Sequence, residues 1–170
     1  MYQFLGSHQN KLDAKGRVSV PASFRASLRD AGGSGRQSSG RQSGESNGTG
    51  IELVLRPSHL HPCIEAWPPS EFATLTAPLE HYSQLSAERE DLAASLYADA
   101  YPVEADKEGR ILIPDPLAAH AGLTEAVVFM GMGTIFQIWE PAAAERRRAE
   151  ARTRARELAP SRALSRAGTA

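Results

Sequence analysis

Hydrophobic and polar residues alternate in short runs that predict strands, and the runs recur in a fixed order. Val18 and Val20 alternate with polar residues, and Ile111 and Ile113 flank a single position in the same way, which is the period of a half-buried strand. Each pair follows a glycine and precedes a proline. Glycine supplies the positive φ of a tight turn, and the first turn of a helix tolerates proline. Each stretch therefore predicts strand, tight turn, strand and helix.

The two stretches are copies of one motif. Residues 13–21 read DAKGRVSVP and residues 106–114 read DKEGRILIP, at a constant offset of 93 residues. The Asp, Gly, Arg and Pro are identical, and two further positions exchange Val for Ile. Such internal similarity indicates a duplicated structural unit.

The segments that follow each motif complete the unit. In the first half we expect a helix at 22–28 and strands at 51–55 and 63–67. In the second half we expect a helix at 115–121 that Gly122 ends, and a hairpin of strands 126–130 and 135–139. The prediction is a mixed β/α fold of two tandem ββαββ units.

Composition divides the chain into four parts. We expect a first unit at 1–68 with a flexible Gly/Ser-rich insert at 31–50, a helical linker at 69–99, a second unit at 100–141 and a basic tail at 142–170. Within the linker, helices are expected at 69–77 and 86–98. The tail is expected to be helical over 141–158 and disordered over 159–170.

Charge is unevenly distributed along the chain, although the formal net charge is only −1. Residues 1–30 hold five basic and two acidic side chains, residues 31–140 hold six and fifteen, and residues 141–170 hold eight and three. A globally basic nucleic-acid binder is therefore excluded. Segregated charge of this kind still provides the local positive surface that DNA binding requires.

Other classes of function find little support in the sequence. The single cysteine, Cys63, excludes an internal disulfide, and no apolar run reaches the length of a membrane helix. The first residues lack the basic flank and apolar stretch of a signal peptide. His59, His61 and Cys63 are too few for a zinc site, and no nucleophile-elbow or Walker sequence occurs. We expect a cytoplasmic protein that is not an enzyme and that uses no cofactor or metal.

The repeated Asp-x-x-Gly-Arg motif, with the alternating aliphatics and proline that follow it, resembles the MraZ family of bacterial transcriptional regulators. The matching segments are FLG at 4–6, LDAKGR at 12–17, VPASFR at 20–25, residues 103–114 and GTIFQIW at 133–139. The resemblance covers roughly residues 2–145 without the insert at 31–50.

The resemblance implies both a fold and a function. It implies two SpoVT/AbrB-like units that form a swapped-hairpin β-barrel with flanking helices, and subunits that assemble into a ring-like homo-oligomer. The ring would bind short direct repeats of double-stranded DNA in the promoter of the division and cell-wall gene cluster, which includes its own gene, and repress transcription. The protein would be nucleoid-associated, with no membrane or small-molecule substrate.

The motif residues suggest distinct roles. Asp13 and Asp106 begin the turns, where a carboxylate accepts backbone N–H bonds, and Gly16 and Gly109 complete them.

Each motif arginine has two interpretations. It either pairs with its own Asp or contacts DNA, since a guanidinium fits both phosphate and the guanine O6/N7 edge. Basic neighbours and the resemblance favour DNA contact for Arg17. For Arg110 the two interpretations are balanced, because Glu104, Asp106 and Glu108 surround it.

Three further cations are candidate DNA contacts. Lys15 and Lys107 lie in the two turns, and Arg25 lies on the first helix, one turn before Arg29. A solvated helix face explains Arg25 and Arg29 equally well. Two other functions stay open, an antitoxin of the AbrB fold and a ring-forming scaffold for protein interactions.

Overall fold

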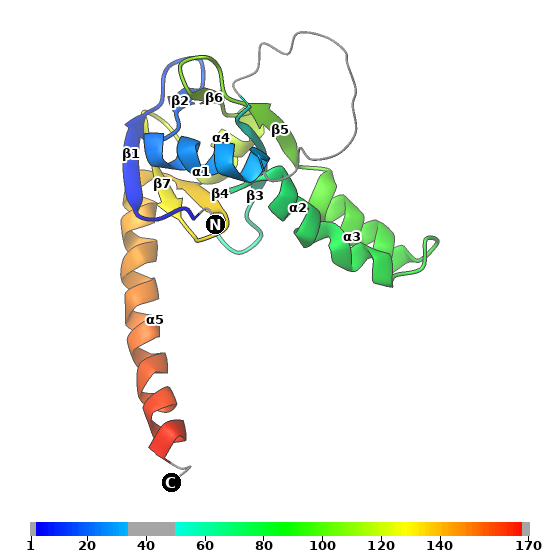
Figure 1. Ribbon diagram of the computed structural model, residues 1–170, viewed down its shortest axis with the longest axis vertical. Helices are drawn as coiled ribbons and strands as arrows, with labels where there is room; N and C mark the ends of the chain where they lie inside the picture. The colour runs from blue at the N-terminus through cyan, green and yellow to red at the C-terminus, as the bar shows by residue number, and fades with distance from the viewer. Residues whose placement is uncertain (1–2, 34–49, 168–170) are drawn as a thin grey trace. The chain divides into compact units, whose positions relative to one another are not determined.

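The computed structural model describes residues 3–33 and 50–167 (Figure 1). The chain divides into two compact units, one up to Glu140 and one formed by the helix α5, Pro141–Ala167. The first unit is a mixed α/β structure built on an antiparallel sheet, as the pattern predicts. Most of the insert expected at 31–50 lies outside the described residues.

The elements of the first unit follow the predicted order. Its strands are β1 (Ser7–Lys11), β2 (Arg17–Ser19), β3 (Glu52–Pro57), β4 (Ile64–Trp67), β5 (Tyr101–Glu104), β6 (Arg110–Leu112), β7 (Ala126–Gly131) and β8 (Phe136–Trp139). Its helices are α1 (Ala22–Gly33), α2 (Pro69–Thr76), the 3₁₀ helix η1 (Ala77–His81), α3 (Ala87–Tyr97) and α4 (Asp115–Ala121).

The six-stranded sheet interleaves the two halves of the chain. Its order is β1-β7-β8-β4-β3-β5, and every neighbouring pair is antiparallel. The first strand of each half pairs with the third strand of the other half, as β1 with β7 and β5 with β3. Neither half can complete its share of the sheet alone.

The motif strands β2 and β6 form a separate two-stranded sheet, which we call the ribbon. Val18 pairs with Ile111, and these residues occupy the same place in the two motif copies. Their neighbours pair crosswise, Arg17 with Leu112 and Ser19 with Arg110. The ribbon therefore has an approximate local twofold axis between Val18 and Ile111.

The described strands do not close into a barrel, which the resemblance had led us to expect. β1 and β5 are the edges of the six-stranded sheet, and β2 and β6 form their own sheet, with one isolated bridge from Val18 to Leu12. The result is an open sheet with the ribbon beside it.

An aromatic cluster holds α1 on the sheet. The ring of Phe24, on α1, lies 5.0 Å from that of Phe136 and 5.3 Å from that of Phe4. Phe129 closes the cluster, and all four rings are fully buried. The strand spacing of Phe129, Phe136 and Trp139 predicts core positions for all three, and the structure confirms this because each is buried.

Local signals placed most helix ends correctly. Gly122 has φ 63° and caps α4, and the Ser86 side chain accepts the Arg89 backbone N–H at the start of α3. The sequence predicts an apolar stripe of Leu92, Leu96 and Tyr97 on α3, and of these only Leu96 is buried.

Two predicted helix ends are wrong. α1 continues to Gly33, and α5 continues through 159–167, where disorder was expected. Ala and Arg in 159–167 favour helix, whereas Pro160 in the same stretch opposes it, so composition alone does not account for the continuation.

A buried ion pair marks where the halves differ. Arg56 Nη1 donates to Glu65 Oε2 at 2.9 Å, and the side chains are only 6% and 10% exposed. Trp67 Nε1 donates to the same oxygen at 3.1 Å.

The corresponding positions of the second half form a neutral group. Trp139 Nε1 donates to Gln137 there, and Met130 is the strand partner of Gln137. The same packing position is therefore filled by a charged pair in the first half and by neutral side chains in the second.

Candidate nucleic-acid interface

The two motif turns have the same hydrogen-bond geometry. Asp13 Oδ1 accepts the backbone N–H groups of Lys15 at 2.9 Å and Arg17 at 2.8 Å. Asp106 Oδ1 does the same in the second copy, with both donors at 2.9 Å. The turn glycines have φ of 82° and 80°, which only glycine adopts without strain. Hydrogen bonds from backbone N–H groups to the aspartate carboxylate, together with the glycine conformation, thus hold both turns in one geometry.

These bonds stabilise the ionised carboxylates. The backbone N–H of Arg17 is the largest cause that lowers the pKa of Asp13 below its ordinary value, and that of Arg110 does so for Asp106. Partial desolvation opposes the shift in both. Both aspartates therefore stay negatively charged at neutral pH.

The motif arginines pair with their own aspartates. Arg17 Nε donates to Asp13 Oδ2 at 3.2 Å, and Arg110 Nε donates to Asp106 Oδ2 at 3.0 Å. This is the ion-pair interpretation of the sequence. Only Nε of Arg17 is engaged, and among the described residues its two Nη groups have no hydrogen-bond partner. The carboxylate therefore orients the guanidinium and leaves its terminal edge available to a ligand.

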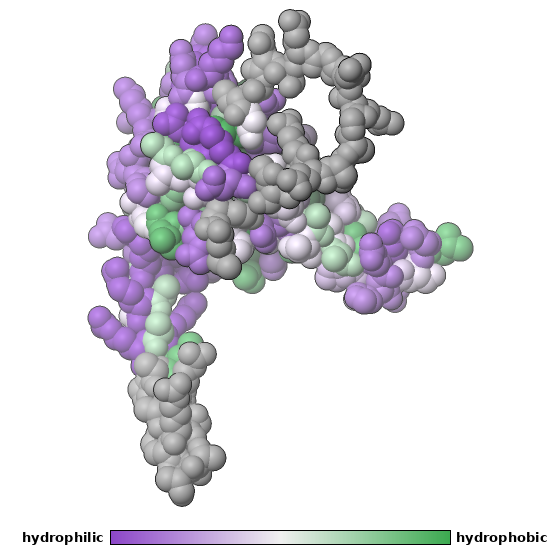
Figure 2. All heavy atoms as spheres, viewed as in Figure 1, coloured by the Kyte–Doolittle hydropathy of each residue, from purple (hydrophilic) through white to green (hydrophobic). Residues whose placement is uncertain are grey.

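Both arginines stand on one face of the ribbon. Residues Arg17, Ser19, Arg110 and Leu112 alternate with the buried Val18 and Ile111, so all four share the outer face. Ser19 and Leu112 are exposed. Figure 2 shows hydrophilic side chains gathered at the top of the view, where Figure 1 places the turns next to β2 and β6. We call these four residues the outer face of the ribbon.

Sequence reasoning missed two of these four residues. Ser19 and Leu112 are not among the residues that the motif predicts to contact DNA. The same alternation, applied to Arg17 and Arg110, places all four on one face, so the signal was present in the sequence.

The two copies carry different charge next to the arginine. Lys15 in the first turn corresponds to Glu108 in the second. Glu108 forms an ion pair with Nη2 of Arg110. The Arg110 side chain therefore has two acidic partners, Asp106 and Glu108. Among the described residues, Arg17 has one acidic partner, Asp13. Lys15 and Lys107 are both exposed in their turns.

Arg25 lies against the second turn, although it belongs to the first half. A Cβ on Gly109 would lie 2.7 Å from Cδ of Arg25, so the side chain covers that glycine. The backbone also joins them, because Val20 N–H donates to the Gly109 carbonyl at 3.0 Å. The position of Arg25 in the second half is taken by Ala118, so no arginine covers the turn at Gly16, where the nearest side chain is that of Leu112. Arg25 thus adds a cation to the second turn, whose sequence also contains Asp106 and Glu108.

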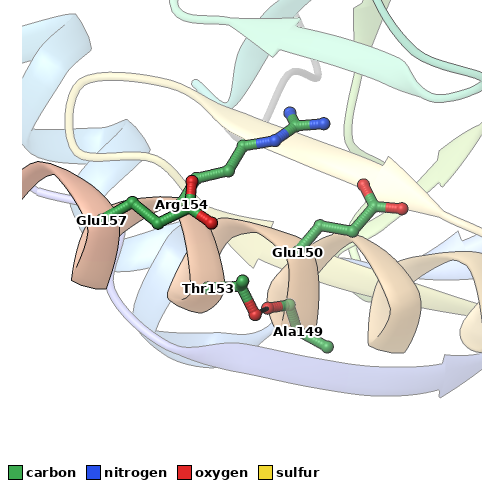
Figure 3. Close-up of a pocket in the computed structure, with 5 residues that line it drawn as sticks. All are labelled: Ala149, Glu150, Thr153, Arg154 and Glu157. Carbon is green, nitrogen blue, oxygen red and sulfur yellow. Dashed lines mark hydrogen bonds between the residues drawn. The ribbon is translucent and has the colours of Figure 1, made fainter.

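Other kinds of site were sought in the described part of the chain. It holds no group of three or more His, Cys, Asp or Glu side chains that could bind a metal ion. It also holds no helix with the length and apolar character needed to cross a membrane. A shallow pocket on α5 is lined by Ala149, Glu150, Thr153, Arg154 and Glu157 (Figure 3). All five come from one helix, so this is a helix surface and not a convergent site.

Comparison with known proteins gives one consistent result. A family model described as "MraZ protein, putative antitoxin-like" matches residues 3–33 and 96–166. The chain belongs to this family. It is 58% identical over 159 residues to a protein of Gluconacetobacter diazotrophicus, covering 94% of this chain and 92% of the relative. A protein of Gluconobacter oxydans is 56% identical, with 95% and 90% covered. One of Xanthobacter autotrophicus is 37% identical, with 93% and 90% covered. All three relatives are named "Transcriptional regulator MraZ".

Proposed function

We propose that this chain is a sequence-specific DNA-binding transcriptional regulator whose DNA contacts lie on the outer face of the ribbon. The observation that carries the proposal is the placement of Arg17 and Arg110 on that one exposed face. The names of the relatives support it. A two-stranded ribbon fits the major groove of B-DNA, which is about 12 Å wide.

The chemistry follows from the orientation of the arginines. Arg17 would use its terminal nitrogens for the O6/N7 edge of guanine, while Asp13 holds Nε. Arg110 would contribute less, because Glu108 already occupies one of its nitrogens. Lys15, Lys107 and Arg25 would neutralise phosphates on either side. Asp13, Gly16, Asp106 and Gly109 would act only through the turn geometry.

The strand exchange supports a proposal for the architecture. We propose that the two halves are AbrB-like units intertwined as swapped hairpins, with boundaries at 1–68 and 100–141. The helical linker would then be 69–99 and the basic tail 142–170. The pairings of β1 with β7 and of β5 with β3 support this arrangement.

One subunit offers too few cations for tight binding. We propose that copies of the chain assemble into a closed ring and engage direct repeats in the promoter of the division and cell-wall gene cluster, including the chain's own gene. Several weak sites linked in this way gain affinity by effective concentration. Repression would follow from occupation of the promoter, and the protein would act at the nucleoid in the cytoplasm.

The ring has a direct test. Analytical ultracentrifugation at micromolar concentration should give one closed oligomer whose mass does not grow with concentration. A clean monomer would refute the ring, and an open-ended series of masses would indicate filaments.

DNA binding has its own test. A gel shift with the DNA upstream of the chain's own gene should show a complex that a scrambled sequence of equal length does not form. Because phosphate contacts release counterions, binding should weaken steeply between 50 and 200 mM salt. Equal affinity for both DNAs would contradict sequence-specific regulation.

The printed description of the family favours one other function. "Antitoxin-like" suggests a protein that binds a toxin as well as DNA. A ring-forming scaffold is the remaining alternative. Co-purification of a stoichiometric protein partner that releases the chain from DNA would favour the antitoxin. Assembly without preference for upstream DNA would favour the scaffold. The relatives' names give no support to an enzyme.

A further inference from the structure

The outer face of the ribbon is nearly symmetric in backbone but not in chemistry. The local axis relates Arg17 to Arg110 and Ser19 to Leu112. The arginines match, but the other pair sets a hydroxyl against an isobutyl group. Leu112 is 56% exposed, whereas its strand neighbours Ile111 and Ile113 are 1% and 2% exposed. The ribbon thus presents one large apolar side chain among cations.

Leu112 has a defined place on this face. It is the cross-strand partner of Arg17, and a Cβ on Gly16 would lie 3.6 Å from Cδ1 of Leu112. The side chain therefore lies against the first turn and beside its arginine. Directly opposite residues of two paired strands have Cβ atoms about 4.5–5.5 Å apart. This distance is more than the rise of one base pair, about 3.4 Å, and less than the rise of two. A group at Leu112 would meet a base next to the one that Arg17 contacts.

We propose that Leu112 is a specificity-determining residue that packs on the 5-methyl group of a thymine in the major groove, next to the guanine contacted by Arg17. The thymine methyl is the one apolar group that a base pair presents in that groove. Ser19, beside Arg110, offers a hydroxyl that serves any base as donor or acceptor. The ribbon would then read different base pairs at its two ends and have a direction on the duplex. This inference rests on the proposed function.

The experiment measures the methyl group directly. Fluorescence anisotropy gives Kd for the full chain on its upstream DNA, with the thymines replaced by uracil one at a time. Uracil keeps every hydrogen bond of thymine and lacks only the methyl. Packing a methyl-sized group is worth about 0.8 kcal/mol, so one replacement should raise Kd about fourfold per contact.

Two variants assign the effect to the residue. In Leu112→Ser, which copies the residue at the related position, the thymine and uracil DNAs should bind equally. In Leu85→Ser, which alters a leucine that is 96% exposed on the linker, the fourfold difference should remain. A structural defect would weaken binding to both DNAs alike and would not remove the difference between them.

The possible failures are distinguishable. If the wild-type chain prefers its upstream DNA but binds every uracil version as tightly as thymine, the assignment of Leu112 is wrong and the proposed function stands. The same holds if the thymine preference persists in Leu112→Ser, or if that variant loses only self-assembly. If the wild-type chain shows no preference for upstream DNA, both the proposed function and this inference are wrong.

Discussion

The buried pair of Arg56 and Glu65 provides a sharp test of how the two halves achieve the same packing. The perturbation is Glu65→Gln, which keeps the shape of the side chain and removes its charge. The new amide oxygen can still accept the Trp67 indole N–H, as Gln137 does for Trp139. What is lost is the counter-charge of Arg56, whose side chain is 6% exposed.

The magnitude follows from burial. Removing one partner of a buried ion pair costs about 3–5 kcal/mol, because the other charge stays desolvated without compensation. The retained indole hydrogen bond places Glu65→Gln at the lower end, about 3 kcal/mol. For a chain of this size that lowers Tm by about 6–12 °C.

The second half of the chain supplies the compensating change. Met130 and Gln137 occupy the positions of Arg56 and Glu65 there. The double variant Arg56→Met/Glu65→Gln should therefore recover stability to within about 1 kcal/mol of the wild type, since neutral replacement of a buried pair is often neutral or stabilising.

The assay is thermal unfolding at one fixed protein concentration, followed by circular dichroism. Glu80→Gln, at an exposed position of η1, controls for the loss of a carboxylate and should stay within about 0.5 kcal/mol of the wild type. The reasoning is refuted if Glu65→Gln is no less stable than Glu80→Gln, or if the double variant is as unstable as the single one.

Three further predictions concern the motif turns. Arg17→Ala should raise Kd for upstream DNA about 5- to 150-fold, from a base contact worth about 1–3 kcal/mol, while gel filtration shows unchanged assembly; unchanged Kd would contradict a DNA contact. The pKa of Asp13 is lowered in the fold, so its stabilising effect is present above the ordinary value of 3.8 and lost as pH falls through the lowered pKa. Unfolding between pH 5 and 2 should therefore show a smaller acid loss in Asp13→Asn than in the wild type. Gly109→Ala should lower Tm more than Gly133→Ala, because both glycines have positive φ but only Gly109 lies under Arg25; equal losses would mean that this contact is unimportant.

The sequence predicted most of the local structure because local chemistry determines it. The Asp and Gly of each motif specify a turn without help from distant residues. Gly122 ends α4 and Ser86 begins α3 by capping bonds that involve only near neighbours. The hairpin of β7 and β8 follows from the short glycine-containing segment between two apolar runs.

The pairing of strands between the two halves could not be predicted from local sequence patterns. β1 pairs with β7 across more than one hundred residues, and nothing within either strand encodes that register. The same limit explains the absent barrel, because closure depends on which edges meet and not on how each strand forms. The cover of Gly109 by Arg25 is a tertiary contact of the same kind.

The candidate site was only partly predictable for a related reason. The motif identified Arg17 and Arg110, and strand alternation extends the same face to Ser19 and Leu112. The sequence left open whether each arginine pairs with its aspartate or remains available. In the structure Arg17 contacts Asp13 through Nε. The ion pair therefore leaves the other two guanidinium nitrogens available to a ligand.

Site-directed cross-linking tests the central claim, that DNA lies on the outer face of the ribbon, most directly. The single native thiol, Cys63, is fully buried, so a cysteine introduced at Ser19 is the accessible one. Upstream DNA that carries a thiol-reactive group on a major-groove base should cross-link to Ser19→Cys at one or a few base positions. Ser70→Cys, at an exposed position of α2, should remain unlinked under the same conditions. Cross-linking of Ser70→Cys with none from Ser19→Cys would contradict the account.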